Sequence, residues 1–311
     1  MELARPYFAV QGLSWIDADN FLSFHIRGIV ICWSIDEKKD CSTFFIQCIL
    51  NMGTAGVPLS YALDKTGNRL AVGDSRGNIA LFDIGSECED EVRQPLSIVR
   101  LAHQKEHVTD LVFAKQGNIL YSCGNDGCIH ECSVSASGEL QTSVSLPAAS
   151  LSGITNIWRR VDSDTKEERI IVGGFFGNTF VLLDLFNGYE FFSVDTGGRQ
   201  RRQDFFVQFT DDGSIGLLSF GIAVCSSRKD GRNEVMVWDH CAEKAPNEGT
   251  LSYPIHGETI NDVCWCPTSS LDRLILLSGS DDCTARLSLY HKGNLSFLQE
   301  LAPLETGVRA V

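Results

Sequence analysis

The sequence repeats itself with a period of about fifty residues, and this period constrains the fold more than any other feature. In the first four copies a glycine marks the same short turn, and the spacings are 49, 50 and 50 residues for Gly28, Gly77, Gly127 and Gly177. The fifth copy has Gly231 in a longer turn, and the sixth has Cys283 at this place. Each copy should therefore be one small structural unit that packs on its neighbours.

Each copy contains short apolar runs separated by turn residues, with almost no helical periodicity. In the second copy these runs read LSYAL, NRLAVGD, NIALFD and LSIVRLA, which is enough for four short strands. Four antiparallel strands per copy are typical of the blade of a β-propeller. We therefore predict an all-β fold, a β-propeller of six four-stranded units with the start of a seventh.

The repeat also predicts the boundaries of the units. They span roughly 8–52, 53–102, 103–150, 151–196, 197–253 and 254–303, and residues 304–311 look like the opening strand of a seventh unit. We treat residues 1–311 as one domain and expect it to belong to a longer chain, because every blade must cover its neighbours. A six-bladed ring closed by the last residues is the alternative.

Two copies carry a sequence signature as well as the period. The sixth has His256, Ser278 and Asp282, and the third has His103, Ser122 and Asp126. These copies resemble the WD40 repeat, in which a His, a Ser or Thr, an Asp and a Trp form a buried hydrogen-bond network within a blade. We assign Leu289 and Cys132 to the tryptophan position, and the resemblance implies that all these residues are structural rather than catalytic.

Composition and missing motifs argue against several classes of protein. The formal net charge is −14, which disfavours nucleic-acid binding over the whole surface. There is no phosphate-binding loop, nucleophile elbow or zinc-protease motif, so we expect no catalytic residues, no cofactor and no small-molecule substrate. Cys128, His130 and Cys132 alternate along one strand, but this spacing does not suit zinc, and we expect ordinary strand packing and no metal site. Without a secretion signal or an apolar run long enough to span a membrane, we expect a cytoplasmic protein with reduced cysteines.

Positive charge gathers in the fifth unit despite the acidic balance. Propeller connectivity would bring the link into its first strand and its longer turn to one rim, which makes a patch of Arg199, Arg201, Arg202, Arg228, Lys229 and Arg232. Clustered arginines suit phosphate groups or an acidic partner. The alternative is a solvated loop with local ion pairs, because acids such as Asp204 and Asp230 lie among them.

A narrower resemblance rests on the fourth and fifth units. The residues that carry it are Gly174, Phe175, Gly177, Phe180, Val181, Gly197, Gly198, Arg201 and Phe205. Their pattern resembles that of the large WD-repeat subunit that partners the tRNA anticodon-loop ribose 2′-O-methyltransferase. A histidine and a tryptophan of that pattern are absent, with Gln200 and Gln203 lying nearby instead. The resemblance implies a non-catalytic scaffold that binds tRNA and recruits the methyltransferase catalytic subunit. The alternative is a scaffold for protein–protein interaction with no nucleic-acid role.

Overall fold

The computed structural model describes residues 9–38, 41–85, 92–147, 151–161, 167–199, 201, 203–209, 217–227, 233–240, 249–250, 256–266, 274–291, 294–301 and 306–308. Most of these residues lie in β-strands, and the helical elements among them are two single 3-10 turns, η1 (Ile26–Gly28) and η2 (Lys115–Gly117). The predicted all-β class is therefore confirmed. The chain divides into two compact units, one around Met1–Val161, Glu167–Gly177 and Val181–Glu190, the other around Asn178–Phe180 and Phe191–Val311.

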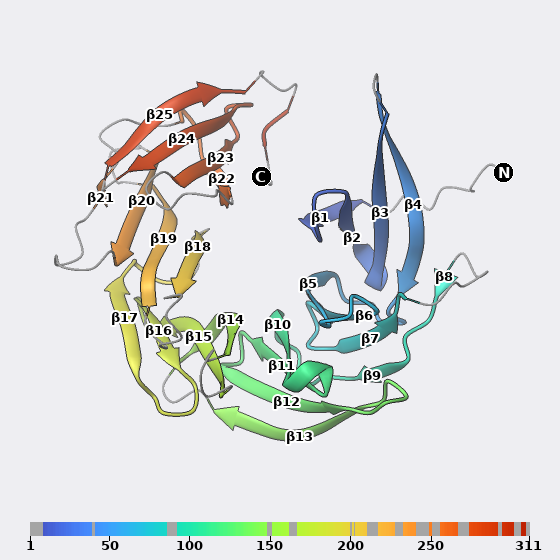
Figure 1. The fold of residues 1–311 in the computed structure, drawn as a ribbon. Helices are drawn as coiled ribbons and strands as arrows, with labels where there is room; N and C mark the ends of the chain where they lie inside the picture. Colours follow the sequence, from blue (N-terminus) through green and yellow to red (C-terminus); the bar gives the residue numbers. More distant parts are fainter. Residues whose placement is uncertain are drawn as a thin grey trace. The chain divides into compact units, whose positions relative to one another are not determined.

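The first three sheets belong to the first unit and follow the repeat closely (Figure 1). The first sheet has the order β1-β2-β3-β4-β8, formed by Val10–Trp15, Asn20–His25, Ile29–Lys38, Cys41–Asn51 and Val92–Arg93. The second has the order β5-β6-β7-β9, formed by Pro58–Leu63, Arg69–Asp74, Ile79–Asp83 and Ser97–Val99. The third has the order β10-β11-β12-β13, formed by Val108–Ala114, Ile119–Gly124, Cys128–Val134 and Leu140–Pro147.

The remaining described strands form three further four-stranded sheets. The fourth has the order β14-β15-β16-β17, formed by Gly153–Val161, Glu168–Phe176, Thr179–Asp184 and Glu190–Asp195. The fifth has the order β18-β19-β20-β21, formed by Gln203–Phe209, Leu217–Ser227, Asn233–His240 and Gly249–Thr250. The sixth has the order β22-β23-β24-β25, formed by Ile260–Cys266, Leu274–Ser280, Ala285–His291 and Asn294–Glu300.

One strand departs from the four-strand pattern. β8 comes from the second repeat but pairs in parallel with β4, so that Ile49 lies opposite Val92 and Leu50 opposite Arg93. The Arg93 guanidinium also donates to the carbonyl of Asp83, over a distance of 2.8 Å. The pairing of β8 with β4 adds a fifth strand to the first sheet and links this sheet to the second repeat.

The turn that defines the repeat has the backbone conformation that favours glycine. The φ angles are positive at Gly28, Gly77, Gly127 and Gly177, between 59° and 77°. Cys283 occupies this turn in the sixth repeat with a φ of 65°, a region that residues with a Cβ adopt at a cost. The periodic glycines therefore reflect a backbone requirement rather than a binding motif.

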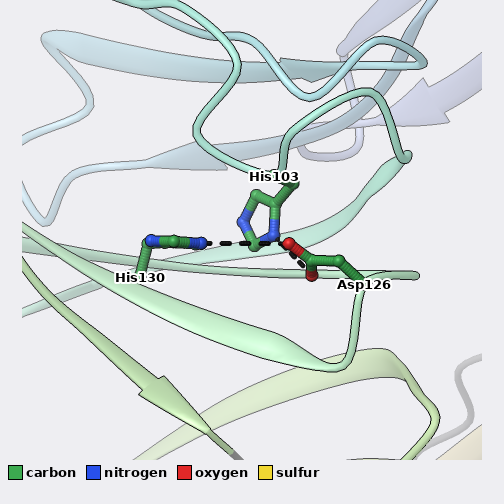
Figure 2. Close-up of side chains that lie close together, drawn as sticks. All are labelled: His103, Asp126 and His130. Atoms are coloured by element: carbon green, nitrogen blue, oxygen red, sulfur yellow. Dashed lines mark hydrogen bonds and ion pairs between the residues drawn. The ribbon is translucent and has the colours of Figure 1, made fainter.

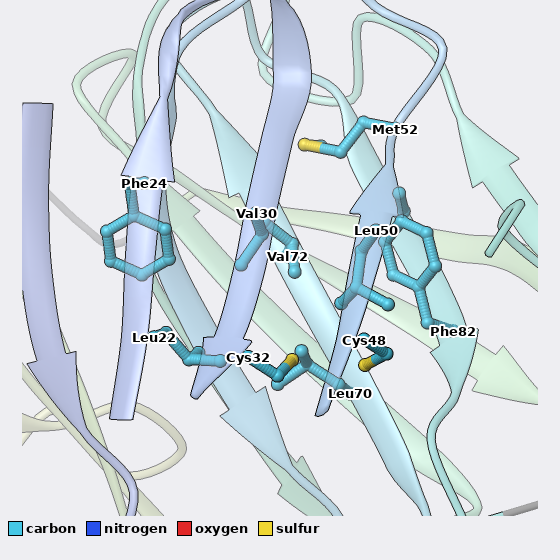
Figure 3. Close-up of a cluster of buried hydrophobic side chains, with 11 residues drawn as sticks. Leu22, Phe24, Val30, Cys32, Cys48, Leu50, Met52, Leu70, Val72 and Phe82 are labelled. Carbon is cyan, nitrogen blue, oxygen red and sulfur yellow. The ribbon is translucent and has the colours of Figure 1, made fainter. Parts of the chain in front are cut away.

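Successive sheets pack face to face through alternating apolar side chains. Figure 3 shows the contact between the first two sheets, where Phe24 and Leu50 meet Val72 and Phe82. Phe82 is fully buried, and a change to alanine at such a site destabilises proteins by about 3–5 kcal/mol. The second sheet packs on the third and the third on β14 and β15 in the same way, as the fifth packs on the sixth in the second unit.

Aspartates on first strands add polar links between neighbouring sheets. Asp110 of β10 accepts a hydrogen bond from the backbone N–H of Ile157 at 3.0 Å, and Asp204 of β18 accepts one from Trp265 at 2.8 Å. Burial raises the pKa of both carboxyl groups, that of Asp110 to about 7. Each link satisfies a backbone N–H group that would otherwise have no partner within the apolar contact.

Candidate functional site

The third sheet contains a buried hydrogen-bond network of His103, Ser122 and Asp126. His103 lies ahead of β10, and its side chain is fully buried. Its Nε2 is 2.8 Å from the Ser122 hydroxyl, and its Nδ1 is 3.0 Å from Asp126 Oδ1. Burial lowers the pKa of His103, so the imidazole is neutral at neutral pH. We call these three residues the third-sheet network.

The sixth sheet repeats this arrangement with His256, Ser278 and Asp282, the sixth-sheet network. His256 Nε2 is 2.9 Å from the Ser278 hydroxyl, and its Nδ1 is 3.1 Å from Asp282 Oδ2. Burial also lowers the pKa of His256. In both networks the histidine joins the first strand of the sheet to the turn between the second and third strands. Both nitrogens of each ring are occupied, so neither histidine is available as a general base in this arrangement.

The strand register corrects our assignment of the tryptophan position in the sixth repeat. In the first sheet Trp33 donates to the Ser23 hydroxyl at 2.8 Å, and Ser23 lies opposite Ile31, two residues before Trp33. In the sixth sheet Ser278 lies opposite Arg286, so the equivalent position is Ser288. Our assignment of Leu289 was wrong by one residue, which in a strand places the side chain on the other face.

The third sheet obeys the same rule, since Ser122 lies opposite His130 and Cys132 follows two residues later. Cys132 is completely buried, and its thiol is 3.9 Å from the Thr142 hydroxyl. The neighbouring Cys128 thiol contacts the backbone carbonyl of Asp126 at 3.8 Å. Cys128 and Cys132 therefore have different partners.

Two other repeats use networks that the sequence pattern did not predict. In the first sheet the Ser23 hydroxyl is 2.8 Å from His25 Nε2, and the histidine comes from the second strand itself. In the second sheet Asp74 is fully buried and accepts hydrogen bonds from the side chains of Thr54 and Asn78 at 2.8 and 2.7 Å. Neither set has the residue spacing of the third and sixth repeats, so only the fold reveals them.

The predicted basic patch is described only in part. Arg199 is exposed, whereas the Arg201 guanidinium lies so close to Gly197 that a Cβ there would be 2.9 Å from its Cζ. The Thr196 N–H donates to the carbonyl of Asn178 at 3.2 Å and fixes the start of this link. The other predicted residues, Arg202, Arg228, Lys229 and Arg232, lie outside the described residues. The convergence of the two basic clusters therefore stays a prediction.

The residues that resemble the methyltransferase partner subunit have two kinds of structural role, side-chain packing and backbone turning. Phe175 is completely buried, and Phe180 stacks on Phe205 with ring centroids 4.7 Å apart. Gly197 and Gly198 both have positive φ angles, of 81° and 104°, which lets the link turn sharply. These features account for the pattern through packing and backbone conformation.

Two of three comparisons with known proteins found similarities, and both agree with this geometry. The family described as "WD domain, G-beta repeat" matches residues 95–130 and 248–287, the segments that hold the two histidine networks. These two segments match the WD40 repeat, and the chain has the WD40 β-propeller fold. A search of the curated proteins found none that matches it.

Two solved structures are similar to this chain over nearly all of its length. One is a chain from "Crystal Structure of Mitotic Checkpoint Complex", 16% identical, with a TM-score of 0.57 over 100% of this chain and 90% of that chain. The other is described as "Crystal structure of WD40 beta propeller domain of Doa1", 15% identical, with a TM-score of 0.57 over 98% of this chain and 86% of that one. Identities this low support the shared fold alone. In the described part of the chain, no helix is long and apolar enough to cross a membrane.

Proposed function

We propose that this WD40 protein is a non-catalytic scaffold for interactions with other macromolecules. The observation that carries the proposal is that its two histidine sets, around His103 and His256, form buried hydrogen-bond networks within single sheets. The repeats then supply a rigid frame whose connecting segments are free to bind partners. A fold of this type occurs in a chain of the structure described as "Crystal Structure of Mitotic Checkpoint Complex".

The link that follows β17 is the surface we propose for a partner. It presents the exposed side chain of Arg199 directly after Gly197 and Gly198, which both have positive φ angles. Arginine makes bidentate contacts with carboxylates and phosphates, which makes an acidic partner the best match. Pull-down with the full-length protein and mass spectrometry would identify partners, and Arg199→Ala should reduce their recovery while Lys65→Ala, at an exposed turn elsewhere, should not.

The finer form of this proposal is that the partner is tRNA, held for a 2′-O-ribose methyltransferase that the scaffold recruits. It is favoured by the resemblance in the fourth and fifth repeats and by the exposed arginine at the matching link. Phosphate contacts release counterions, so tRNA binding should weaken steeply as salt rises. A variant with alanine at Arg199, Arg201, Arg202, Arg228, Lys229 and Arg232 should show a shallower slope, by about one per lost phosphate contact.

Three outcomes separate these forms. Salt-dependent tRNA binding that the substitutions weaken supports the tRNA form. Binding of tRNA that is unaltered in the six-residue variant would exclude this patch. Recovery of protein partners through Arg199, with no tRNA binding even beside the methyltransferase, would favour the protein-interaction scaffold.

A further inference from the structure

A third side chain lies beside the third-sheet network and changes what it can bind. His130, on β12, directs its ring toward Asp126, with Nε2 3.9 Å from Asp126 Oδ2 (Figure 2). The rings of His103 and His130 meet edge to face, with centroids 4.5 Å apart. One potential ligand atom from each of His103, Asp126 and His130 lies within 4.8 Å of the others. Three separate positions of one sheet thus bring two imidazoles and a carboxylate together.

This cluster contains polar atoms that the protein leaves without hydrogen bonds. Asp126 Oδ2 and His130 Nδ1 are both buried and have no hydrogen-bond partner among the described residues. The Asp126 side chain is only 6% exposed, so water does not readily replace the missing partner. Buried polar groups are nearly always satisfied, and an exception requires an explanation. With its proton on Nδ1, His130 would turn the lone pair of Nε2 toward Asp126.

We propose that His103, Asp126 and His130 bind a divalent transition-metal cation, with Zn²⁺ the best match. Zinc bonds of about 2.0–2.2 Å in a tetrahedron place ligand atoms roughly 3.3–3.5 Å apart. His103 Nδ1 is 3.0 Å from Asp126 Oδ1, His130 Nε2 is 3.9 Å from Asp126 Oδ2, and one ligand atom from each of the three residues lies within 4.8 Å of the others, which is near this value. Side-chain rotations would bring the three ligand atoms to these separations.

The surroundings of His103 suit a metal ligand. If Nδ1 binds the cation in place of its proton, Nε2 carries the N–H and donates to the Ser122 hydroxyl, already 2.8 Å away. An outer hydrogen bond of this kind orients most metal-binding histidines. Two imidazole nitrogens with one carboxylate favour zinc over magnesium or calcium, which prefer oxygen ligands throughout. The proposal departs from our sequence-based expectation of no metal, which considered His130 with Cys128 and Cys132.

The sixth-sheet network is a natural counter-example within the same chain. Its aspartate is followed four residues later by Arg286, where the third repeat has His130. Arg286 forms an ion pair with Glu300 at 2.9 Å, and a guanidinium cannot bind a cation. We therefore expect zinc to bind at the third-sheet network and not at the sixth-sheet network.

The test is titration of the reduced, metal-free, full-length protein with Zn²⁺, followed by calorimetry, and with Co²⁺ as a spectroscopic probe. His130→Arg copies the sixth repeat, and His291→Arg makes the same change at an exposed strand end. We expect one zinc site in the unaltered protein and in His291→Arg, and an affinity at least ~100-fold lower in His130→Arg, since even outer-shell changes cost 10–100-fold. The Co²⁺ spectrum should show d–d bands without thiolate charge transfer, because the ligands are nitrogen and oxygen.

The chain has twelve cysteines, so zinc binding alone would not support the proposal. Undiminished affinity in folded His130→Arg, the absence of any zinc site, or a thiolate band in the Co²⁺ spectrum of the site that His130 controls would each overturn it. Circular dichroism checks folding. If His130→Arg fails to fold, His130→Gln, which keeps a neutral side chain of similar reach, applies the same test.

Discussion

The third and sixth sheets hold the same histidine, serine and aspartate, but they surround the aspartate differently. Asp282 accepts hydrogen bonds from the Gly257 N–H at 3.0 Å and from the Thr284 hydroxyl at 2.6 Å, so both its oxygens are occupied. In the third sheet the N–H after the histidine, that of Gln104, donates to Leu101 instead. Cys128 replaces the threonine, and its backbone N–H donates to Asp126 Oδ1 at 3.1 Å.

This difference in hydrogen bonding gives the two networks different properties. In the sixth sheet every oxygen of the aspartate is used, and the network can only hold the turn in place. In the third sheet Asp126 Oδ2 has no hydrogen-bond partner among the described residues, and His130 Nε2 lies 3.9 Å from it. Identical motif residues therefore do not imply identical chemistry. The N–H that follows the histidine decides whether the second carboxylate oxygen is occupied, and the residue four positions after the aspartate decides what lies beside it.

The largest expected difference between the sheets is in stability. His103→Ala should lower the free energy of unfolding by about 3–4 kcal/mol, because it leaves Asp126 buried without its main partner. His256→Ala should cost about 2 kcal/mol, because Asp282 keeps its bonds to Gly257 and Thr284. Urea unfolding measures both. Equal losses of unfolding free energy in the two variants would show that the hydrogen bonds of Asp282 to Gly257 and Thr284 do not contribute to stability. The control is His291→Ala, at an exposed site, which should change stability by less than about 0.5 kcal/mol.

The pH dependence of stability should be shared by the two sheets. Burial lowers the pKa of His103 and of His256 in the folded chain. As the pH falls through about 6.5, these histidines therefore become protonated in the unfolded chain while they stay neutral in the folded chain. The contribution of each neutral histidine is therefore present above about pH 6.5 and is lost as the pH falls through its folded pKa. His103→Gln and His256→Gln should each flatten the decline in stability between about pH 7 and pH 5. A decline that neither change reduces would assign it to other groups.

The aspartates extend this loss to lower pH. Burial opposes ionisation of Asp282, but hydrogen bonds from Thr284 and Gly257 outweigh it and lower its pKa to about 2. Burial also opposes ionisation of Asp126, but its interactions with His103, His130 and the Cys128 N–H together outweigh burial and hold the pKa well below its ordinary value. Ionised aspartates therefore stabilise the fold above about pH 4, and this contribution disappears as the pH falls further.

The smallest expected effect is a gain of metal binding in the sixth sheet. The double change Thr284→Cys and Arg286→His gives this sheet the third-sheet residues, so it should acquire a second zinc site. The new site should bind at least ~10-fold more weakly, because Gly257 still donates to Asp282 Oδ2. Calorimetry of the double variant, compared with Thr284→Cys alone, measures the added site. Stoichiometry that stays at one would limit the proposal to features that only the third sheet has.

The local regularities of this protein were predictable from its sequence. Alternating apolar runs, turn glycines such as Gly77 and Gly127, and the spacing of His103, Ser122 and Asp126 report short-range requirements of strands and turns. What sequence reasoning misplaced was a matter of register, as with Leu289 and Ser288, because a shift of one residue is invisible in composition but reverses the face of a strand.

The sequence by itself determined the repeat, the all-β class, the WD40 character and the residues of the two histidine networks. Only the tertiary structure decided that His25 and Asp74 organise their own sheets, that Arg201 folds back on Gly197, and that His130 reaches Asp126. The physical reason is distance. Propensity and periodicity act between near neighbours along the chain, whereas a binding site depends on which atoms different strands and turns bring within a few ångströms of one another, and on which of them are left without a hydrogen bond.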